Sequence, residues 1–312
     1  MNPHLLTLSS LRRGPLAALI AALGALLLVL AAAAPASGEL IDENLEISPP
    51  GANDWGCQPS AVHPNPVILV PGTFESMAKN WSTLAPVLKS QGYCVYSLNY
   101  GETNGVPATA PVKESAAELS VFVDRVLEST GAKQVDLVGH SQGGMMPRWY
   151  IGFLGGATKV DSLIGIAPSS HGTQGVIVPA GDGDGTALSS ADDGLLYELC
   201  AACIDQQAGS SFMQELNAIG DIVQPVDYTV ISTRYDEVVT PYTSQFLDGR
   251  EQDVTNLLIQ DYCPLDPIEH DQAPNDPVVH QMVANALLQD GPADPSFQPV
   301  CGPDLLLGEQ AL

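Results

Sequence analysis

The stretch VDLVGHSQGGMM, residues 135–146, decides the fold. Its first part, residues 135–138, suits a strand buried in a sheet, and the residues after GHSQG at 139–143 can form a helix. GHSQG matches G-x-S-x-G, in which a sharp turn from strand to helix lifts the serine above the sheet. Small residues at both flanking positions prevent clashes in such a turn. We therefore predict that Ser141 is a nucleophile presented on a strained turn.

Strands and helices alternate on both sides of this turn. Short apolar runs predict strands, and apolar residues three and four positions apart predict helices. The predicted strands are residues 67–70, 93–100, 135–138, 160–166, 226–232 and 254–260. The predicted helices are residues 81–90, 115–129, 142–154 and 276–288. This order predicts an α/β protein with a mostly parallel, doubly wound sheet that is covered on both faces.

Residues 171–209 break the alternation and are rich in Gly, Asp, Ser and Ala. An insertion on the carboxyl side of the strands is where a small cap or lid would lie. Within it, Asp182-Gly-Asp184-Gly resembles the start of a calcium loop, but the spacing of the remaining ligands fails and position 6 is Ala187. We predict neither a metal nor another cofactor.

The first 38 residues have the pattern of an export signal. Arg12 and Arg13 precede an apolar run from Leu16 to Ala34, and small residues follow it. An uncleaved membrane anchor is the alternative, and the route, general secretory or twin-arginine, stays open. The signal predicts a secreted, extracellular protein whose residues 39–312 form one catalytic domain.

The charge of the chain limits its partners. The formal net charge is −25, and removal of the two arginines in the signal takes it to about −27. Such acidity argues against nucleic acid or an anionic membrane as a partner. It suits a neutral substrate, and we expect a monomer.

Six cysteines form an even set in an exported chain, which predicts three disulfides. One pair flanks the apolar run at 66–70, another brackets the last predicted helix, and the C-A-A-C pair predicts a local bridge. No second cysteine pair or nearby histidine completes a zinc site around C-A-A-C. The predicted pairs are Cys57 with Cys94, Cys200 with Cys203, and Cys263 with Cys301.

A serine nucleophile needs a base and an acid, here in the chain order serine, acid, histidine. Three histidines follow Ser141. His171 precedes any suitable acid, and His280 lies inside a predicted amphipathic helix. His270 lies in the loop between the last strand and that helix, so we predict that it is the base, with His280 as its main rival.

The acid is expected at the carboxyl end of a strand. Asp236 and Glu237 both follow the predicted strand at 226–232. Because the valines after Glu237 suit packing, Asp236 is preferred. It would hold the imidazole of the base in one tautomer and stabilise the imidazolium.

Two backbone donors are needed to stabilise an oxyanion. One is the N–H of Gln142, the residue after the nucleophile. The other comes from the loop after the strand at 67–70, where Thr73 offers a backbone N–H and a hydroxyl, and Phe74 is the alternative.

From about Trp55 to Cys301 the chain resembles the secreted bacterial class 2 lipases of the α/β-hydrolase superfamily, which are typical of actinobacteria. The most specific pieces are VILVPGTF, GHSQGGMMPRWY, CAACIDQQAGSSF, YDEVVTPYTSQFL and CPLDPIEH. The resemblance implies an α/β-hydrolase fold and the same three disulfide pairs. It also implies a triad of Ser141, Asp236 and His270, and an oxyanion hole of Gln142 with Thr73 or Phe74. Many members have His-Gly before the oxyanion residue, whereas this chain has Pro71-Gly72.

Three functional hypotheses follow. The first is a secreted triacylglycerol lipase that forms an acyl-enzyme and acts on neutral lipid at an oil–water interface. The second is a carboxylesterase or polyesterase for short acyl chains or aliphatic polyesters. The third, from another class, is a non-catalytic α/β-hydrolase-like binding protein.

Overall fold

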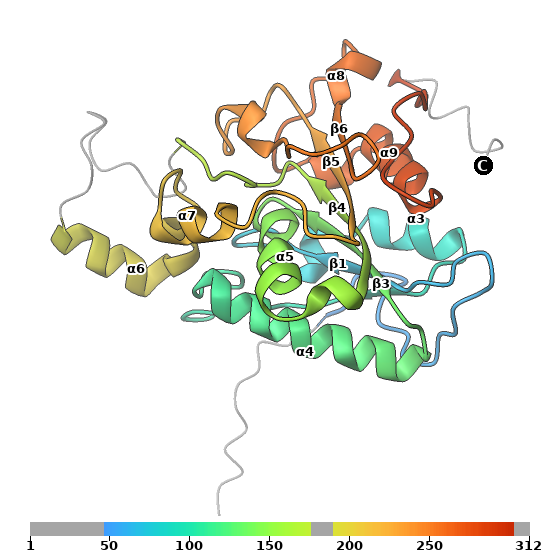
Figure 1. Ribbon diagram of the computed structural model, residues 1–312, viewed down its shortest axis with the longest axis horizontal. Coiled ribbons are helices and arrows are strands. Elements are labelled where there is room, and N and C mark those ends of the chain that lie inside the picture. The colour runs from blue at the N-terminus through green and yellow to red at the C-terminus, as the bar shows by residue number, and fades with distance from the viewer. Residues whose placement is uncertain (1–46, 176–189, 303–312) are drawn as a thin grey trace, which may run out of the picture. The chain divides into compact units, whose positions relative to one another are not determined.

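The computed structural model describes residues 47–175 and 190–302, with the side chains of residues 190–196 excepted (Figure 1). The predicted export signal and the Asp182–Asp184 stretch lie outside these residues. The described helices include none that combines the length and apolar character needed to cross a membrane.

In the described part of the chain, six parallel strands form one sheet in the order β2-β1-β3-β4-β5-β6. The strands are β1 (Val67–Val70), β2 (Val95–Ser97), β3 (Val135–His140), β4 (Val160–Ile166), β5 (Asp227–Ser232) and β6 (Val254–Leu258). The parallel sheet confirms the predicted α/β class.

Helices cover both faces of the sheet, with α4 and α5 on one face and α3 and α9 on the other (Figure 1). The α-helices are α2 (Met77–Asn80), α3 (Leu84–Ser90), α4 (Val112–Thr130), α5 (Gln142–Phe153), α6 (Ser190–Asp205), α7 (Ser211–Asn217), α8 (Ile259–Tyr262) and α9 (Pro277–Leu287). This confirms the doubly wound arrangement.

Alternate residues of the strands enter two apolar cores. In β1, Ile68 and Val70 join a core with α4 and α5, while Val67 and Leu69 join a core with α3 and α9. All four side chains are fully buried. A strand covered on both faces needs a continuous apolar run, which is why VILV predicted β1 correctly.

Several predicted elements differ from the structure at their ends; for example, the last two residues of the strand predicted at 254–260 lie in α8. The strand predicted at 93–100 is shortened to β2 because the side chain of Asn53 hydrogen-bonds both the N–H and the carbonyl of Ser97. The helix predicted at 81–90 starts only at Leu84, as α3, and a short helix that was not predicted, α2, precedes it, with Ser76 as an N-cap that accepts from the N–H of Lys79. At β2 and α2 a polar side chain from outside the predicted element makes the boundary contacts, whereas no described side chain caps the start of α3.

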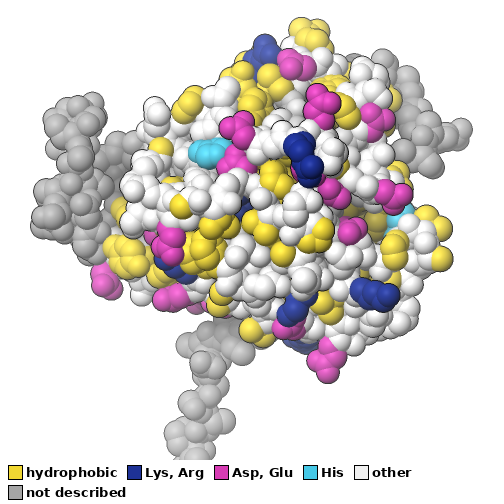
Figure 2. All heavy atoms as spheres, viewed as in Figure 1, with side chains coloured by type: hydrophobic (Ala, Val, Ile, Leu, Met, Phe, Trp, Pro, Cys, Tyr) yellow, Lys and Arg dark blue, Asp and Glu magenta, His cyan; other side chains and the backbone are white. Residues whose placement is uncertain are grey.

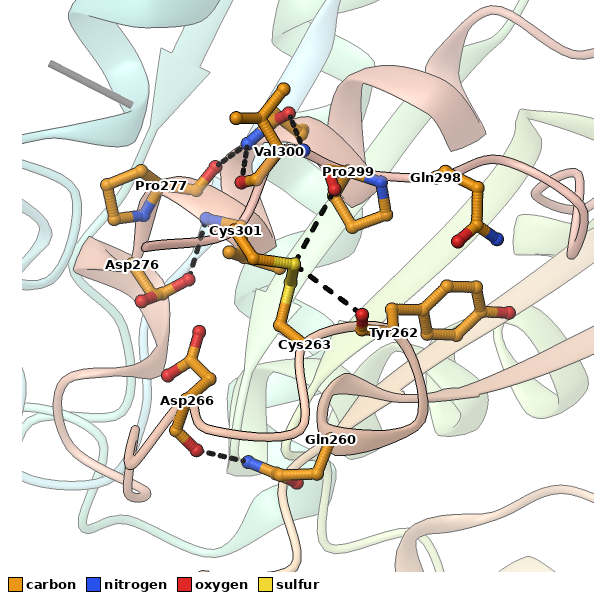
Figure 3. The surroundings of a disulfide bond; sticks show 12 residues. Gln260, Tyr262, Cys263, Asp266, Asp276, Pro277, Gln298, Pro299, Val300 and Cys301 are labelled. Carbon is orange, nitrogen blue, oxygen red and sulfur yellow. Dashed lines mark hydrogen bonds between the residues drawn. A yellow bond between two sulfur atoms is a disulfide. The ribbon is translucent and has the colours of Figure 1, made fainter. Parts of the chain in front are cut away.

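The three predicted disulfides are present, in the pairs Cys57–Cys94, Cys200–Cys203 and Cys263–Cys301. Figure 3 shows the last of them, which joins the residue after α8 to the segment that follows α9. The first joins the segment before β1 to the start of β2. The first bridge thus ties a peripheral segment to a strand of the sheet, whereas the last ties the segment after α9 to the end of α8.

Candidate active site

The candidate site lies at the point in the sheet where the direction in which successive strands are added reverses. β1 lies between β2 and β3, and β3 leads the chain to the other side of the sheet. Val70 at the end of β1 pairs with Gly139 near the end of β3. Crevices at the carboxyl ends of strands at such a reversal are the usual ligand sites of open α/β sheets. The loops that carry Thr73 and Ser141 therefore start side by side.

Ser141 occupies a strained turn between β3 and α5. Its φ is 54° and its ψ is −121°, a conformation that costs free energy in a non-glycine residue. A Cβ added to Gly139 would lie 1.8 Å from the carbonyl oxygen of Gly143, and one added to Gly143 would lie 2.1 Å from that of Val70. Both flanking glycines are therefore sterically required, as expected for a nucleophile elbow.

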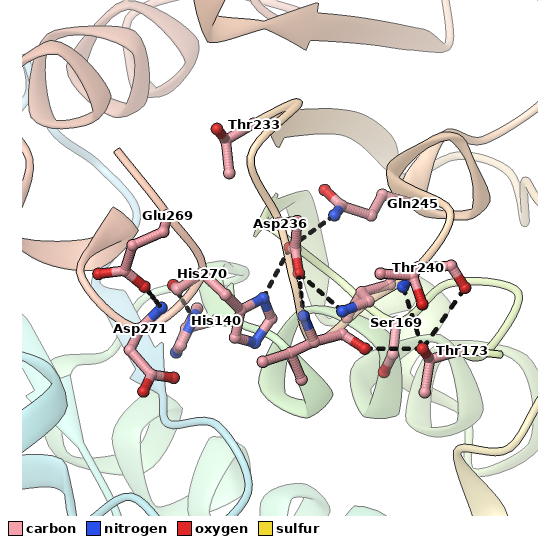
Figure 4. Close-up of polar contacts among 12 residues, drawn as sticks. His140, Ser169, Thr173, Thr233, Asp236, Thr240, Gln245, Glu269, His270 and Asp271 are labelled. Atoms are coloured by element: carbon pink, nitrogen blue, oxygen red, sulfur yellow. Dashed lines mark hydrogen bonds and ion pairs between the residues drawn. The ribbon is translucent and has the colours of Figure 1, made fainter. Parts of the chain in front are cut away.

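Asp236 and His270 form a buried hydrogen-bonded pair (Figure 4). The Nδ1 atom of His270 donates to Oδ2 of Asp236 over 2.7 Å. The other carboxylate oxygen accepts from the N–H groups of Val238 and Val239, and Gln245 donates its side-chain amide to Oδ2 at 2.7 Å. Four donors thus fix the carboxylate, which can orient the imidazole of His270 in a single tautomer.

The alternatives to this pair have other surroundings. Glu237 is exposed. The Nε2 atom of His280 donates to the carbonyl of Pro274 at 2.9 Å, and His171 pairs with Asp221 at 3.0 Å. The geometry therefore favours Asp236 and His270 over their rivals.

The Ser141 turn and the His270 loop are in contact. His140, directly before Ser141, places its Nε2 atom 3.0 Å from the carbonyl oxygen of His270. The Ser141 hydroxyl has no hydrogen-bond partner among the described residues, and such catalytic contacts often tighten only when substrate is bound. A hydrogen bond from Ser141 to His270 thus stays a prediction.

The backbone N–H groups predicted to bind an oxyanion differ in whether they already have a hydrogen-bond partner. Gln142 is the first residue of α5, where helical N–H groups have no partner within the helix. The N–H of Phe74 already donates to the carbonyl of Pro107 at 3.2 Å. Of the two loop residues, Thr73 is therefore the better candidate for the second donor.

The fully buried side chain of Gln206 hydrogen-bonds the side chains of both residues that carry these backbone donors, Thr73 and Gln142. Its amide nitrogen donates to the hydroxyl of Thr73 at 2.9 Å and to the side-chain oxygen of Gln142 at 3.2 Å. Neither Gln206 nor Gln245 was predicted to belong to the site. No local pattern distinguishes these glutamines, because their partners are distant in sequence or set by the fold.

Among the described side chains of residues 47–175 and 197–302, no group of three or more His, Cys, Asp or Glu could hold a metal ion.

Two relatives show partial matches. Lipase B of Pseudozyma antarctica is 27% identical over 202 residues, which are 62% of this chain and 52% of the relative. A triacylglycerol lipase of Pseudarthrobacter phenanthrenivorans is 35% identical over 89 residues, 27% of each chain. The match thus spans about half the length of the first relative and about a quarter of the second.

The fold and the family are established more broadly. The crystal structure of Aspergillus fumigatus lipase B aligns with a TM-score of 0.64 and 21% identity, over 80% of this chain and 57% of that one. The chain has the α/β-hydrolase fold, as predicted. The family model for lipase (class 2) matches residues 64–283, more than half of the chain. The protein therefore belongs to the class 2 lipase family.

Proposed function

We propose that the protein is a secreted serine hydrolase of carboxylic esters, and specifically a triacylglycerol lipase. The observation that carries this proposal is the buried pair of Asp236 and His270 beside the strained turn of Ser141. Membership of the class 2 lipase family supports it.

In the proposed mechanism the oxygen of Ser141 attacks the ester carbonyl while Nε2 of His270 accepts the hydroxyl proton. The oxyanion accepts hydrogen bonds from the N–H groups of Gln142 and Thr73. His270 then gives its proton to the leaving alcohol, which departs and leaves an acyl-serine. Water, deprotonated by His270, attacks this ester, and His270 returns the proton to the oxygen of Ser141 as the fatty acid leaves.

The surroundings of the site suit an apolar, uncharged substrate. Phe74 is 49% exposed beside Thr73, and Tyr235 is 50% exposed beside Asp236. On the face drawn in Figure 2, acidic side chains are scattered among hydrophobic and polar ones. An anionic substrate would be repelled by so acidic a chain, whereas a neutral triacylglycerol would not. We further propose one catalytic domain over residues 39–312, working as an extracellular monomer at an oil–water interface.

The test compares the wild type with Ser141→Ala and His270→Ala on emulsified tributyrin and triolein. Either substitution should lower turnover by about 10⁵- to 10⁶-fold. The matched controls are Ser296→Ala, at an exposed serine, and His280→Gln, at the rival histidine. Both should keep wild-type turnover.

Substrate range separates the remaining hypotheses. Hydrolysis of triolein supports the lipase, whereas hydrolysis of soluble acetate or butyrate esters alone would replace it with a short-chain esterase. Folded wild-type protein that an organophosphonate ester fails to label at Ser141 would favour a non-catalytic binding protein.

A further inference from the structure

His140 lies at the centre of a chain of three hydrogen bonds. The backbone N–H of Gly72 donates to Oδ1 of Asn80 at 2.8 Å. The Nδ2 atom of Asn80 lies 3.2 Å from Nδ1 of His140, and Nε2 of His140 lies 3.0 Å from the carbonyl oxygen of His270. The chain thus runs from the loop that carries Thr73 to the loop that carries His270.

The partners determine the tautomer of His140. The carbonyl of His270 can only accept, so Nε2 must carry a proton. Oδ1 of Asn80 is occupied by the N–H of Gly72, so the amide nitrogen of Asn80 donates to Nδ1, which must be unprotonated. His140 is therefore a neutral imidazole with its proton on Nε2. Burial lowers the pKa of His140 well below its ordinary value, in agreement with this assignment.

Close packing also fixes the residues of this hydrogen-bonded chain. His140 is 1% exposed and Asn80 is 3% exposed. A Cβ added to Gly72 would lie 3.0 Å from Nδ1 of His140 and 3.2 Å from Cβ of Ser141. The rings of His140 and His270 have centroids 4.9 Å apart (Figure 4). Neither the loop after β1 nor the His270 loop can shift without disturbing His140.

We propose that His140 and Asn80 are positioning residues. They hold the loop that carries Thr73 and the loop that carries His270 in fixed positions around Ser141. This inference rests on the proposed ester hydrolysis, for which Thr73, Ser141 and His270 must converge on one carbonyl group. His140 hydrogen-bonds the backbone carbonyl of His270 and packs its ring against the imidazole of His270, so it acts by placing that ring. Because small displacements of reacting groups slow the chemical step strongly, the effect falls on kcat rather than on KM.

The kinetic test uses Asn80→Leu, His140→Phe and the double variant on a soluble ester. Each single variant should lower kcat by about 10- to 100-fold with KM nearly unchanged. The double variant should be no slower than the slower single variant, because both substitutions break one chain. The control is His280→Phe, which removes another buried histidine bonded to a backbone carbonyl. Its kcat should stay within about 2-fold of the wild type.

If Asn80→Leu does not fold, a second variant tests the same hydrogen-bonded chain. Asn80→Asp keeps the acceptor for Gly72 and places a carboxylate at Nδ1 of His140, which should bind a second proton. The chain is then restored as an ion pair, so this variant should keep more kcat than Asn80→Leu or His140→Phe.

A spectroscopic readout does not depend on turnover. In protein labelled with ¹⁵N-histidine, His140 should be protonated on Nε2 alone in the wild type and on both nitrogens in Asn80→Asp. The resonance of the Nδ1 proton that His270 shares with Asp236 should move in His140→Phe and stay unchanged in His280→Phe.

The inference fails if the wild type hydrolyses esters while folded Asn80→Leu and His140→Phe keep full kcat, or if His140 is protonated on Nδ1. An inactive wild type with the predicted tautomer would instead overturn the proposed function and leave the hydrogen-bonded chain intact.

Discussion

Asp236 accepts a hydrogen bond from His270 over 2.7 Å, between residues that follow different strands of the sheet. Three further donors, from Val238, Val239 and Gln245, hold the same carboxylate. A carboxylate with its acceptor sites filled in this way stays in one orientation. The imidazole it binds must carry its proton on Nδ1, which leaves Nε2 unprotonated, as the proposed mechanism requires.

Asp236→Asn tests the importance of that tautomer. An amide nitrogen facing Nδ1 of His270 would favour the tautomer with its proton on Nε2, which cannot accept a proton from Ser141. We expect kcat on a soluble ester to fall by about 10⁴-fold with the thermal midpoint little changed. Glu237→Gln, at the exposed neighbour, is the control and should retain wild-type kcat. An Asp236→Asn enzyme with a tenth of the normal kcat or more would contradict the assigned role.

Substitution of the flanking glycines tests the turn itself. Gly139→Ala and Gly143→Ala each place a methyl group within about 2 Å of a backbone oxygen, so the strand or the helix must move. We expect either change to lower the free energy of unfolding by more than about 3 kcal/mol or to prevent folding. Gly291→Ala, where nothing lies within 4 Å, should be neutral in the same urea titration. Two alanine variants as stable as the wild type would show that the turn is less constrained than its geometry indicates.

The sequence predicted the elements whose signal is local. The apolar run VILV, buried on both faces, located β1 at its observed boundaries, and the boundaries predicted for β4 were also correct. The order serine, acid, histidine led to Asp236 and His270, which the structure brings into contact. Contacts made through tertiary structure could not be read in this way. Asn80, Gln206 and Gln245 act on residues 8 to 133 positions away, and amide side chains of this kind are common on protein surfaces.

The disulfides should contribute unequally to stability. Cys57 and Cys94 close a loop with a sequence separation of 37, whereas Cys200 and Cys203 are only 3 apart. In the chain-entropy model a longer loop restricts the unfolded state more, which corresponds to about 4 kcal/mol for the first bridge and about 2 kcal/mol for the second. Urea unfolding of the two serine double variants should therefore show a larger loss for Cys57/Cys94. The reverse order would indicate that local packing around Cys200 and Cys203 outweighs chain entropy.

Asp136 should destabilise the protein above neutral pH. It is the second residue of β3, is only 7% exposed, and accepts a hydrogen bond from the hydroxyl of Ser162 at 2.9 Å. Burial, reinforced by the nearby charge of Asp161, raises the pKa of Asp136 to about 7. Between its ordinary pKa of 3.8 and this value the folded state binds a proton that the unfolded state has lost. Stability must therefore fall as the pH rises through that window, because the folded state binds more protons there.

Asp136→Asn removes this penalty, since the amide oxygen can still accept from Ser162 and no charge is buried. We expect the variant to exceed the wild type in free energy of unfolding by about 2–4 kcal/mol at pH 8, with the gain shrinking toward pH 5. Urea titrations at the two pH values measure this difference, and Glu128→Gln, at an exposed acid, should show no gain at either. Because Asp136 lies at the opposite end of β3 from Ser141, ester hydrolysis at pH 8 should be unchanged. A gain of equal size at both pH values would mean that packing, and not ionisation, separates Asn from Asp at this position.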